Sequence, residues 1–149
     1  MIGAMIIKRM VRSAYEMMNR GDVDSMMAGW ADDAVYDSAS ELGVGVTIKG
    51  KKAIGEWHHR YVEEFPKRKF TVKNICLQEA FPLLSAFIGT SVIMVDWSIT
   101  ETNKDGREFR YNGASVLHMR KGKCIHASDY ISMVGLPQLL TLMKESGKA

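Results

Sequence analysis

The chain of 149 residues has only two cysteines, and neither belongs to a pattern of metal ligands. Cys76 and Cys124 fall in predicted strands and lack the spacing of a zinc site or a redox pair, so we interpret them as small buried residues with reduced thiols. This argues against a disulfide framework or a cysteine nucleophile. It also favours the cytoplasm as the location of the protein.

Long apolar runs and charge of one sign are also missing. No segment approaches the roughly 20 apolar residues that span a bilayer. The apolar start of the chain is followed by Lys8 and Arg9 rather than preceded by them, which is not typical of a signal peptide. The formal net charge is +3, and the longest basic cluster is residues 67–69. We therefore expect neither a membrane nor a nucleic acid as a partner.

Motifs for phosphate binding, dinucleotide binding and a nucleophile elbow are absent. His58 and His59 are neighbours on a predicted helix, so their side chains diverge by about 100° and cannot bind one metal ion together. His118 and His126 lie in facing strands of one predicted hairpin, but no third ligand accompanies them. We therefore expect no cofactor and no bound metal.

The order of periodic patterns predicts one α+β domain over residues 1–149, in which a curved, cone-shaped sheet wraps around helices and leaves an apolar pocket. The hydrophobic content of 46% and the charged content of 25% are those of a globular protein. The predicted helices are residues 6–19, a short segment from residue 22 or 24 to residue 31, residues 51–65 and residues 136–144. The predicted strands are residues 35–39, 70–79, 85–102, 107–120 and 124–134, with a mobile loop at residues 43–50. Turn signals at residues 103–106 and 121–122 indicate that the last four strands are sequential and antiparallel.

Asp129 is the strongest candidate for chemistry. Period-two alternation places it on one face of the last strand with Ile125, Ala127 and Ile131, which are apolar or small. A buried carboxylate has a raised pKa, which suits a general acid or base. An aspartate held by a structural hydrogen bond fits the same pattern equally well.

Three other polar residues are candidates to assist Asp129. Asp96 is flanked by apolar residues in a long strand and would form a carboxylate pair with Asp129 if the two strands lie close together. Tyr36 and Ser38 share one face of the first strand and would supply hydroxyl groups. A simpler interpretation makes Tyr36 a core aromatic residue with a satisfied hydroxyl.

The segments 19–24 (NRGDVD) and 30–34 (WADDA) resemble the opening of the nuclear transport factor 2-like superfamily. The closest likeness is to its SnoaL-like branch, which includes polyketide cyclases, ketosteroid isomerase and limonene-1,2-epoxide hydrolase. The resemblance covers almost the whole chain. It implies a cone-shaped fold that hosts enzymes, binding proteins and scaffolds alike, and it implies a homodimer formed through the outer face of the sheet, where Trp97 or Tyr130 would be exposed.

The resemblance to the epoxide hydrolase identifies individual residues. Its two catalytic aspartates fall on Asp96 and Asp129, and its activating tyrosine falls on Tyr36. Its asparagine falls on Ser38 and its bridging arginine on Met94, so the relay is incomplete. Without that cation, two buried carboxylates would share a proton.

The resemblance to ketosteroid isomerase is weaker. Its oxyanion tyrosine falls on Ala14, next to Tyr15, and its base falls on Ser38, next to Asp37. On a strand, a shift of one residue moves a side chain to the other face. Steroid isomerase activity is therefore disfavoured.

Together these observations predict a cofactor-independent enzyme that acts on a small, largely apolar molecule by epoxide opening, cyclisation or isomerisation. The predicted catalytic residues are Asp129, Asp96, Tyr36 and Ser38, and the predicted substrate-binding residues are Trp57, Tyr61, Met94 and Asn112. The alternative is a module of the same fold that binds a small ligand or forms a dimer without catalysing a reaction.

Overall fold

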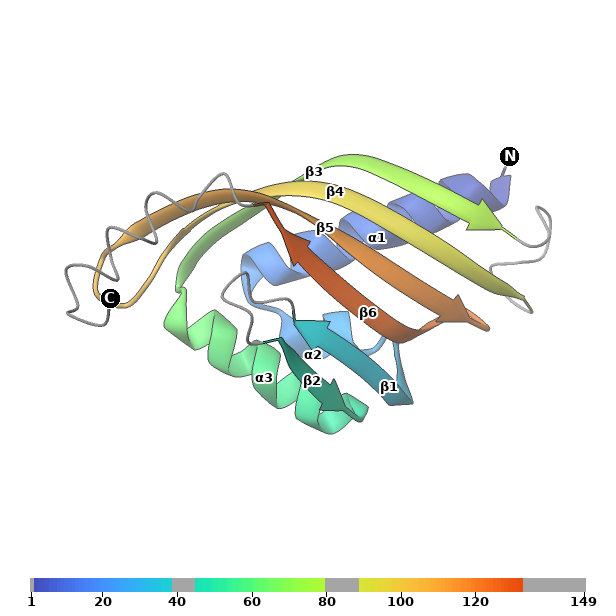
Figure 1. Ribbon diagram of the computed structural model, residues 1–149, viewed down its shortest axis with the longest axis horizontal. Coiled ribbons are helices and arrows are strands. Elements are labelled where there is room, and N and C mark those ends of the chain that lie inside the picture. The colour runs from blue at the N-terminus through green and yellow to red at the C-terminus, as the bar shows by residue number, and fades with distance from the viewer. Residues whose placement is uncertain (1, 39–44, 80–88, 133–149) are drawn as a thin grey trace.

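The computed structural model describes residues 2–38, 45–79 and 89–132, and it shows a curved six-stranded sheet with helices on its concave side (Figure 1). The elements in chain order are α1 (Ile2–Arg20), α2 (Val23–Met27), β1 (Trp30–Ser38), β2 (Val46–Lys49), α3 (Lys51–Glu64), β3 (Lys67–Glu79), β4 (Thr90–Thr102), β5 (Glu108–Arg120) and β6 (Lys123–Ile131). The predicted α+β class with a curved mixed sheet is confirmed. The predicted helix at residues 136–144 and the predicted strand ends at residues 39, 85 and 134 lie outside the described residues.

The strands are ordered β2-β1-β6-β5-β4-β3 across the sheet. The four strands from β3 to β6 are sequential and antiparallel, as predicted. β1 joins the other side of β6 in a parallel pairing that sets Tyr36 beside Ala127 and Ser38 beside Asp129. This one parallel pair therefore brings the polar end of β1 to the candidate acid–base residue.

Several boundaries differ from the prediction, and at two of them the type of secondary structure also differs. Residues 46–49, predicted as part of a mobile loop, form strand β2 and pair with β1. The second helix was predicted to continue to residue 31, but α2 ends at Met27, and β1 begins at Trp30. Trp30 pairs with Cys124 of β6, whose backbone N–H donates to the carbonyl of Gly29 at 2.9 Å. Pairing with a distant strand therefore overrides the local helical pattern here.

The NRGDVD motif has an architectural role. Gly21 has a φ of 76°, which lets the chain turn at the end of α1, and Asp22 accepts a hydrogen bond from the backbone N–H of Ser25 to cap α2. The amide of Asn19 donates to the carbonyl of Phe70 at 3.0 Å and accepts from the Phe70 N–H at 2.7 Å. The motif thus ends one helix, starts the next and ties the first to β3.

Apolar side chains between the helices and the concave face of the sheet form the core. β4 contributes a buried row of Ile93, Val95, Trp97 and Ile99, and the alternate row faces outward, with Met94 52% exposed. The two thiols are free, and Cys76 is exposed, which corrects its predicted burial, whereas Cys124 is buried as predicted.

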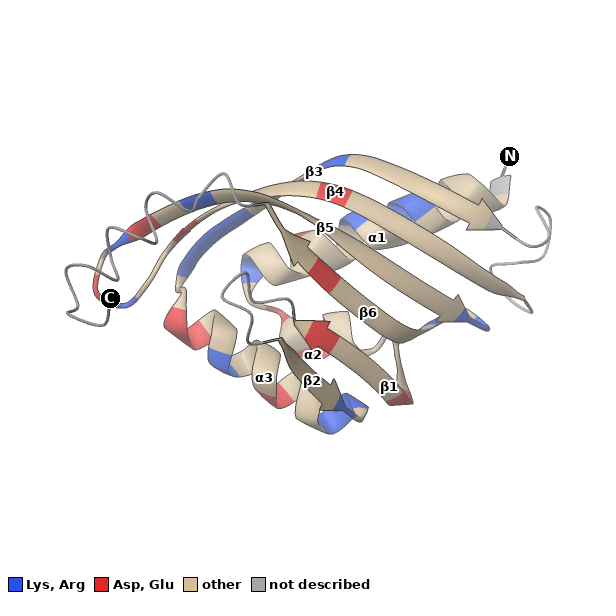
Figure 2. Cartoon of the chain, in the orientation of Figure 1, with Lys and Arg blue, Asp and Glu red and all other residues tan. Residues whose placement is uncertain are grey.

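Charged residues are spread over all elements without a stripe of one sign (Figure 2). Within the described part of the chain, no helix is long and apolar enough to cross a membrane.

Candidate functional site

A cavity of about 260 Å³ lies between the helices and the concave face of the sheet. Its wall is mostly apolar, with aromatic side chains that include Trp57 and Tyr61 of α3. Several sulfur-containing side chains also line it, namely Met10, Met18, Met26, Met119 and Cys124. Methionine adapts its shape easily, so this wall suits a small apolar ligand.

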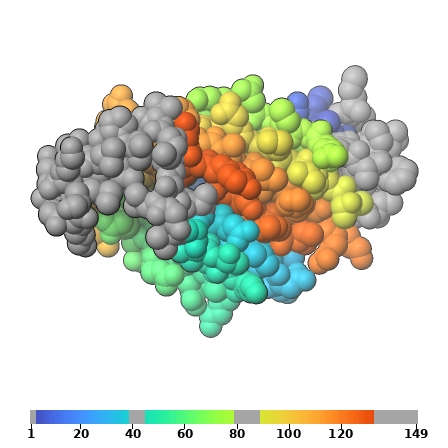
Figure 3. Space-filling model, in the orientation of Figure 1, coloured from blue at the N-terminus to red at the C-terminus, as the bar shows by residue number. Residues whose placement is uncertain are grey.

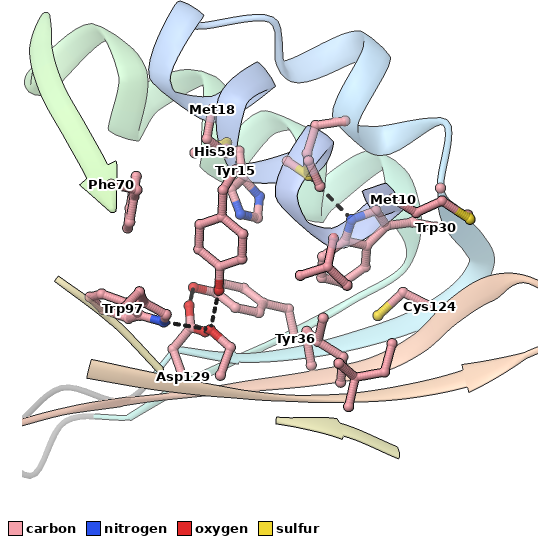
Figure 4. A pocket seen from close by; sticks show the side chains of 18 of the residues that line it. Met10, Tyr15, Met18, Trp30, Tyr36, His58, Phe70, Trp97, Cys124 and Asp129 are labelled. Carbon is pink, nitrogen blue, oxygen red and sulfur yellow. Dashed lines mark hydrogen bonds between the residues drawn. The ribbon is translucent and has the colours of Figure 1, made fainter. Parts of the chain in front are cut away.

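The carboxyl group of Asp129 faces this cavity from β6 (Figure 4). The hydroxyl of Tyr36 donates to its Oδ2 atom at 2.5 Å, and the hydroxyl of Ser115 donates to its Oδ1 atom at 2.5 Å. Burial raises the pKa of Asp129, and the two hydrogen bonds partly oppose this rise because they favour the carboxylate. Asp129 is therefore a carboxyl group with increased proton affinity and a fixed orientation.

Ser115 connects Asp129 to two further side chains. Its Oγ atom accepts a hydrogen bond from Nε1 of Trp97 at 2.9 Å and lies 2.9 Å from the hydroxyl of Tyr15. A serine hydroxyl has one proton and two lone pairs, so donation to Asp129 makes Tyr15 a donor to Ser115. Burial is the main reason why the pKa of the Tyr15 phenol is raised, with the charge of Asp129 adding to it. The resulting network joins α1, β4, β5 and β6.

Sequence reasoning missed Tyr15, Trp97 and Ser115 as members of this site. Tyr15 and Ser115 are 100 residues apart and meet only because α1 packs on the concave side of the sheet. Trp97 was expected on the outer face, but it is 4% exposed and points into the core. The available signal was the strongly apolar row that Trp97 shares with Val95 and Ile99.

The predicted pair of Asp96 and Asp129 is wrong. Asp96 lies on the outward row of β4, where its Oδ2 atom accepts a hydrogen bond from the amide of Asn74 at 2.9 Å. Asp129 lies on the other face of the sheet, toward the cavity. Alternation on β4 allows only one row to face the core, and the row of Val95, Trp97 and Ile99 buries more apolar surface.

Two predicted substrate-binding residues are also misplaced. Met94 belongs to the outward row of β4 and is 52% exposed. The side chain of Asn112 accepts a hydrogen bond from Nζ of Lys73 at 2.6 Å on an exposed surface. In contrast, Tyr36, Ser38, Trp57 and Tyr61 line the cavity with Asp129.

A second buried carboxylate, which sequence reasoning did not identify, lies behind the aromatic wall. Glu101 is 3% exposed and accepts hydrogen bonds from the hydroxyls of Tyr61 and Tyr111, the latter at 2.6 Å. Burial raises the pKa of Glu101, and the two phenols and nearby Arg68 oppose this rise. Tyr61 and Tyr111 line the cavity themselves, so Glu101 fixes the position of two wall residues.

The histidines lie in separate places. His118 and His126 stack on each other with ring centroids 5.5 Å apart, as their facing positions predicted, and Nε2 of His126 lies 2.6 Å from Asp37. His58 lines the cavity, whereas His59 lies 3.0 Å from Asp24 on the exposed side of α3. Within the described residues, no group of three or more histidine, cysteine or acidic side chains could hold a metal ion.

Comparison with known proteins connects this arrangement to a family. A family model described as a SnoaL-like domain matches residues 11–127. No curated protein has a sequence that matches this chain significantly. Solved structures with this fold include a candidate isomerase from Bacillus subtilis, which is 19% identical with a TM-score of 0.66 over 95% of this chain and 92% of its own.

Two further structures show the range of the fold. A candidate polyketide cyclase from Xanthomonas campestris is 17% identical, with a TM-score of 0.60 over 90% of this chain and 93% of its own. TerC, which was co-crystallised with polyporic acid, is 15% identical, with a TM-score of 0.68 over 89% of this chain and 96% of its own. Other neighbours are described as candidate hydroxylases and a candidate dehydratase. At these identities the likeness shows the fold, which is the nuclear transport factor 2-like fold that the sequence predicted.

Proposed function

Because the chain belongs to the SnoaL-like domain family, we propose that it is a cofactor-independent enzyme in which Asp129 moves a proton on a small apolar substrate. The observation that carries this proposal is one carboxyl group of raised pKa that faces an apolar cavity and is oriented by two hydroxyl groups. A buried carboxylate of this kind is a stronger base than one in water, which suits it to remove a proton near neutral pH.

The geometry leaves room for the substrate proton. Each carboxylate oxygen has two lone pairs, and the protein uses one on each, through Tyr36 and Ser115. In the proposed reaction, Asp129 accepts a proton from a carbon next to a carbonyl group, and the electron pair of that C–H bond forms an enolate. Asp129 then returns the proton, either to a different carbon or to the alkoxide that forms when the enolate attacks a second carbonyl.

The first of these outcomes is an isomerisation and the second is a cyclisation. Both need a single group that takes a proton and gives it back. Epoxide opening by the predicted relay needs an acid and a base together, and Asp129 is the one carboxylate among the described residues that lines the cavity. Since Asp96 lies outside, we favour isomerase or cyclase chemistry over epoxide hydrolysis. Ser38 also lines the cavity and remains a proposed helper.

Replacement of Asp129 tests the proposal. We would screen small cyclic ketones, linear diketones and epoxides in D₂O and follow both product formation and deuterium uptake by NMR. Asp129→Asn should reduce turnover at least 100-fold, since general-base catalysis contributes about 10²–10⁴-fold. Asp96→Asn is the matched control and should behave as the wild type because Asp96 faces outward. Equal turnover in Asp129→Asn and the wild type would overturn the assignment.

The alternative function is a small-ligand-binding protein without catalysis. It is favoured by one observation, namely that both oxygens of Asp129 already have protein donors. Co-crystallisation of TerC with polyporic acid supports the use of this fold for an organic ligand. Saturable binding of a screened compound, with no product and no deuterium uptake, would favour this alternative.

We also propose that the protein is a cytoplasmic homodimer. The free thiols of Cys76 and Cys124 support the location. Tyr130 is 57% exposed and Met94 is 52% exposed on the outer face of the sheet, which is the side of the molecule turned to the viewer in Figure 3. Sedimentation at micromolar concentration should give the mass of a dimer, and Tyr130→Lys should shift it toward the monomer.

A further inference from the structure

A buried ring nitrogen in the wall of the cavity has no hydrogen-bond donor among the described residues. His58 lies on α3, is 7% exposed and lines the cavity. Its Nδ1 atom lies 2.9 Å from the carbonyl oxygen of Ile54, so Nδ1 carries the ring proton, because a carbonyl oxygen can only accept. Nε2 then has a bare lone pair. No group in residues 2–38, 45–79 or 89–132 donates a hydrogen bond to it.

Aromatic rings enclose the rest of the imidazole. The ring centroids of Trp57, Tyr36 and Trp30 lie 5.0, 5.2 and 6.1 Å from that of His58. Burial lowers the pKa of His58 to about 4, so the ring is neutral at physiological pH and its Nε2 atom is an acceptor. A buried acceptor without a donor is unfavourable for folding, and such a group calls for an explanation.

His58 and Asp129 lie on opposite sides of the cavity. Figure 4 shows His58 on the side of the helices and Asp129 on the side of the sheet. Tyr36 connects the two, since its ring lies 5.2 Å from the imidazole while its hydroxyl group donates to Asp129. The cavity thus has a polar group on each of these sides and a mostly apolar wall between them.

We propose that Nε2 of His58 is a binding subsite that accepts a hydrogen bond from a hydroxyl or N–H group on an otherwise apolar ligand of one or two rings. The cavity of about 260 Å³ sets this size, because pockets for drug-sized ligands are about 300–1,000 Å³. A ligand carboxylate is excluded from the subsite, since it has no proton to donate. The proposal rests on the proposed use of the cavity as a ligand site, but it does not require Asp129 to be catalytic.

A pair of matched probes tests the subsite. 2-Naphthol and 2-methylnaphthalene have nearly the same shape, but only the naphthol has a donor. We would measure both dissociation constants by calorimetry for the wild type, His58→Phe, which keeps an aromatic ring, and Asp129→Asn. The preference for naphthol should fall about tenfold in His58→Phe, which corresponds to the loss of one hydrogen bond. It should persist in Asp129→Asn.

A spectroscopic measurement separates binding at His58 from a change in packing. In protein with ¹⁵N-labelled histidine, naphthol should shift the Nε2 resonance of His58 and leave that of His59 in place. An unchanged Nε2 resonance with bound naphthol, an unchanged preference in His58→Phe, or no naphthol binding at all would overturn the subsite. Loss of the preference only in Asp129→Asn would also overturn it, because it would make Asp129 the acceptor. If naphthol binds at His58 but no screened compound turns over, the catalytic proposal fails and the subsite stands.

Discussion

At the scale of single residues, opposing effects set the proton affinity of Asp129. Burial raises its pKa, whereas the hydrogen bonds from Ser115 and Tyr36 lower it. The same network keeps Tyr36 protonated, because burial and the charge of Asp129 raise the pKa of its phenol. The Tyr36 hydroxyl therefore stays protonated and donates its hydrogen bond to Asp129. Removal of this hydroxyl should change the pKa of Asp129 directly.

Tyr36→Phe should raise the pKa of Asp129, since it removes a donor that favours the carboxylate. In the proposed reaction the carboxylate is the base, so kcat/KM falls as the pH falls through this pKa. The acid limb of the pH–rate profile should therefore move to higher pH in the variant. Activity on the acid side should drop about tenfold for each pH unit of the move.

Tyr130→Phe is the control for this prediction. Tyr130 is the neighbour of Asp129 in the chain, but it lies on the outer face and is exposed. The pH–rate profile of Tyr130→Phe should coincide with that of the wild type. A Tyr36→Phe profile that also coincides with the wild type would show that the hydrogen bond does not tune Asp129.

At the scale of elements, β5 depends on a glycine that gives space to Trp97. A Cβ atom at Gly113 would lie 2.3 Å from a ring carbon of Trp97 and 2.7 Å from the carbonyl oxygen of Tyr130. Gly113→Ala should therefore displace Trp97, whose N–H donates to Ser115, and destabilise the fold by about 1–3 kcal/mol. Urea unfolding and near-UV circular dichroism would measure the two effects.

A glycine-to-alanine substitution in α3 should have the opposite effect on the free energy of unfolding. A Cβ atom at Gly55 meets its nearest neighbour, Cγ of Met27, at an ordinary contact distance of 3.6 Å. Gly55→Ala should stabilise the protein by about 0.5–1 kcal/mol because alanine loses less conformational entropy in a helix. Equal effects of the two substitutions would contradict the close packing of Trp97 on β5.

The elements also show what the sequence can and cannot predict. Alternation correctly predicted that Tyr36 and Ser38 share one face of β1. On β4, alternation separates Met94 and Asp96 from Val95, Trp97 and Ile99, as the structure has them. It did not say which row of β4 faces the core, and the resemblance to a two-aspartate relay led to the wrong choice. The row that buries more apolar surface faces the core, and on β4 this is the row that contains Trp97.

At the scale of the whole molecule, the site depends on contacts between distant segments. The parallel pairing of β1 with β6 sets Ser38 beside Asp129, and α1 reaches Ser115 through Tyr15. Local patterns specify helices and strands, so they gave the fold class and the position of Asp129. They carry no information on which hydroxyl groups meet Asp129, because the register of the pairing and the docking of α1 set those contacts.

The stability of the whole molecule should depend on buried groups with opposite responses to pH. The pKa of His58 is about 4 in the folded state and 6.5 in the unfolded chain, so the unfolded chain takes up the proton first. Its contribution is fully present above pH 6.5 and is lost toward pH 4, a change of about 3 kcal/mol. Asp129 acts in the other direction. Burial raises its folded pKa above 3.8, so its ionisation lowers stability as the pH rises through that pKa.

Urea unfolding between pH 4 and pH 7 separates these contributions. In His58→Gln the gain in unfolding free energy between pH 4 and 6.5 should disappear. In Asp129→Asn the gain should become larger than in the wild type, because Asp129 no longer opposes it. Glu101, whose pKa is also raised by burial, still opposes part of the gain. His59→Gln is the matched control, because His59 is exposed beside His58 on the same helix. A His58→Gln curve parallel to that of the wild type would show that His58 is hydrated or charged in the folded protein.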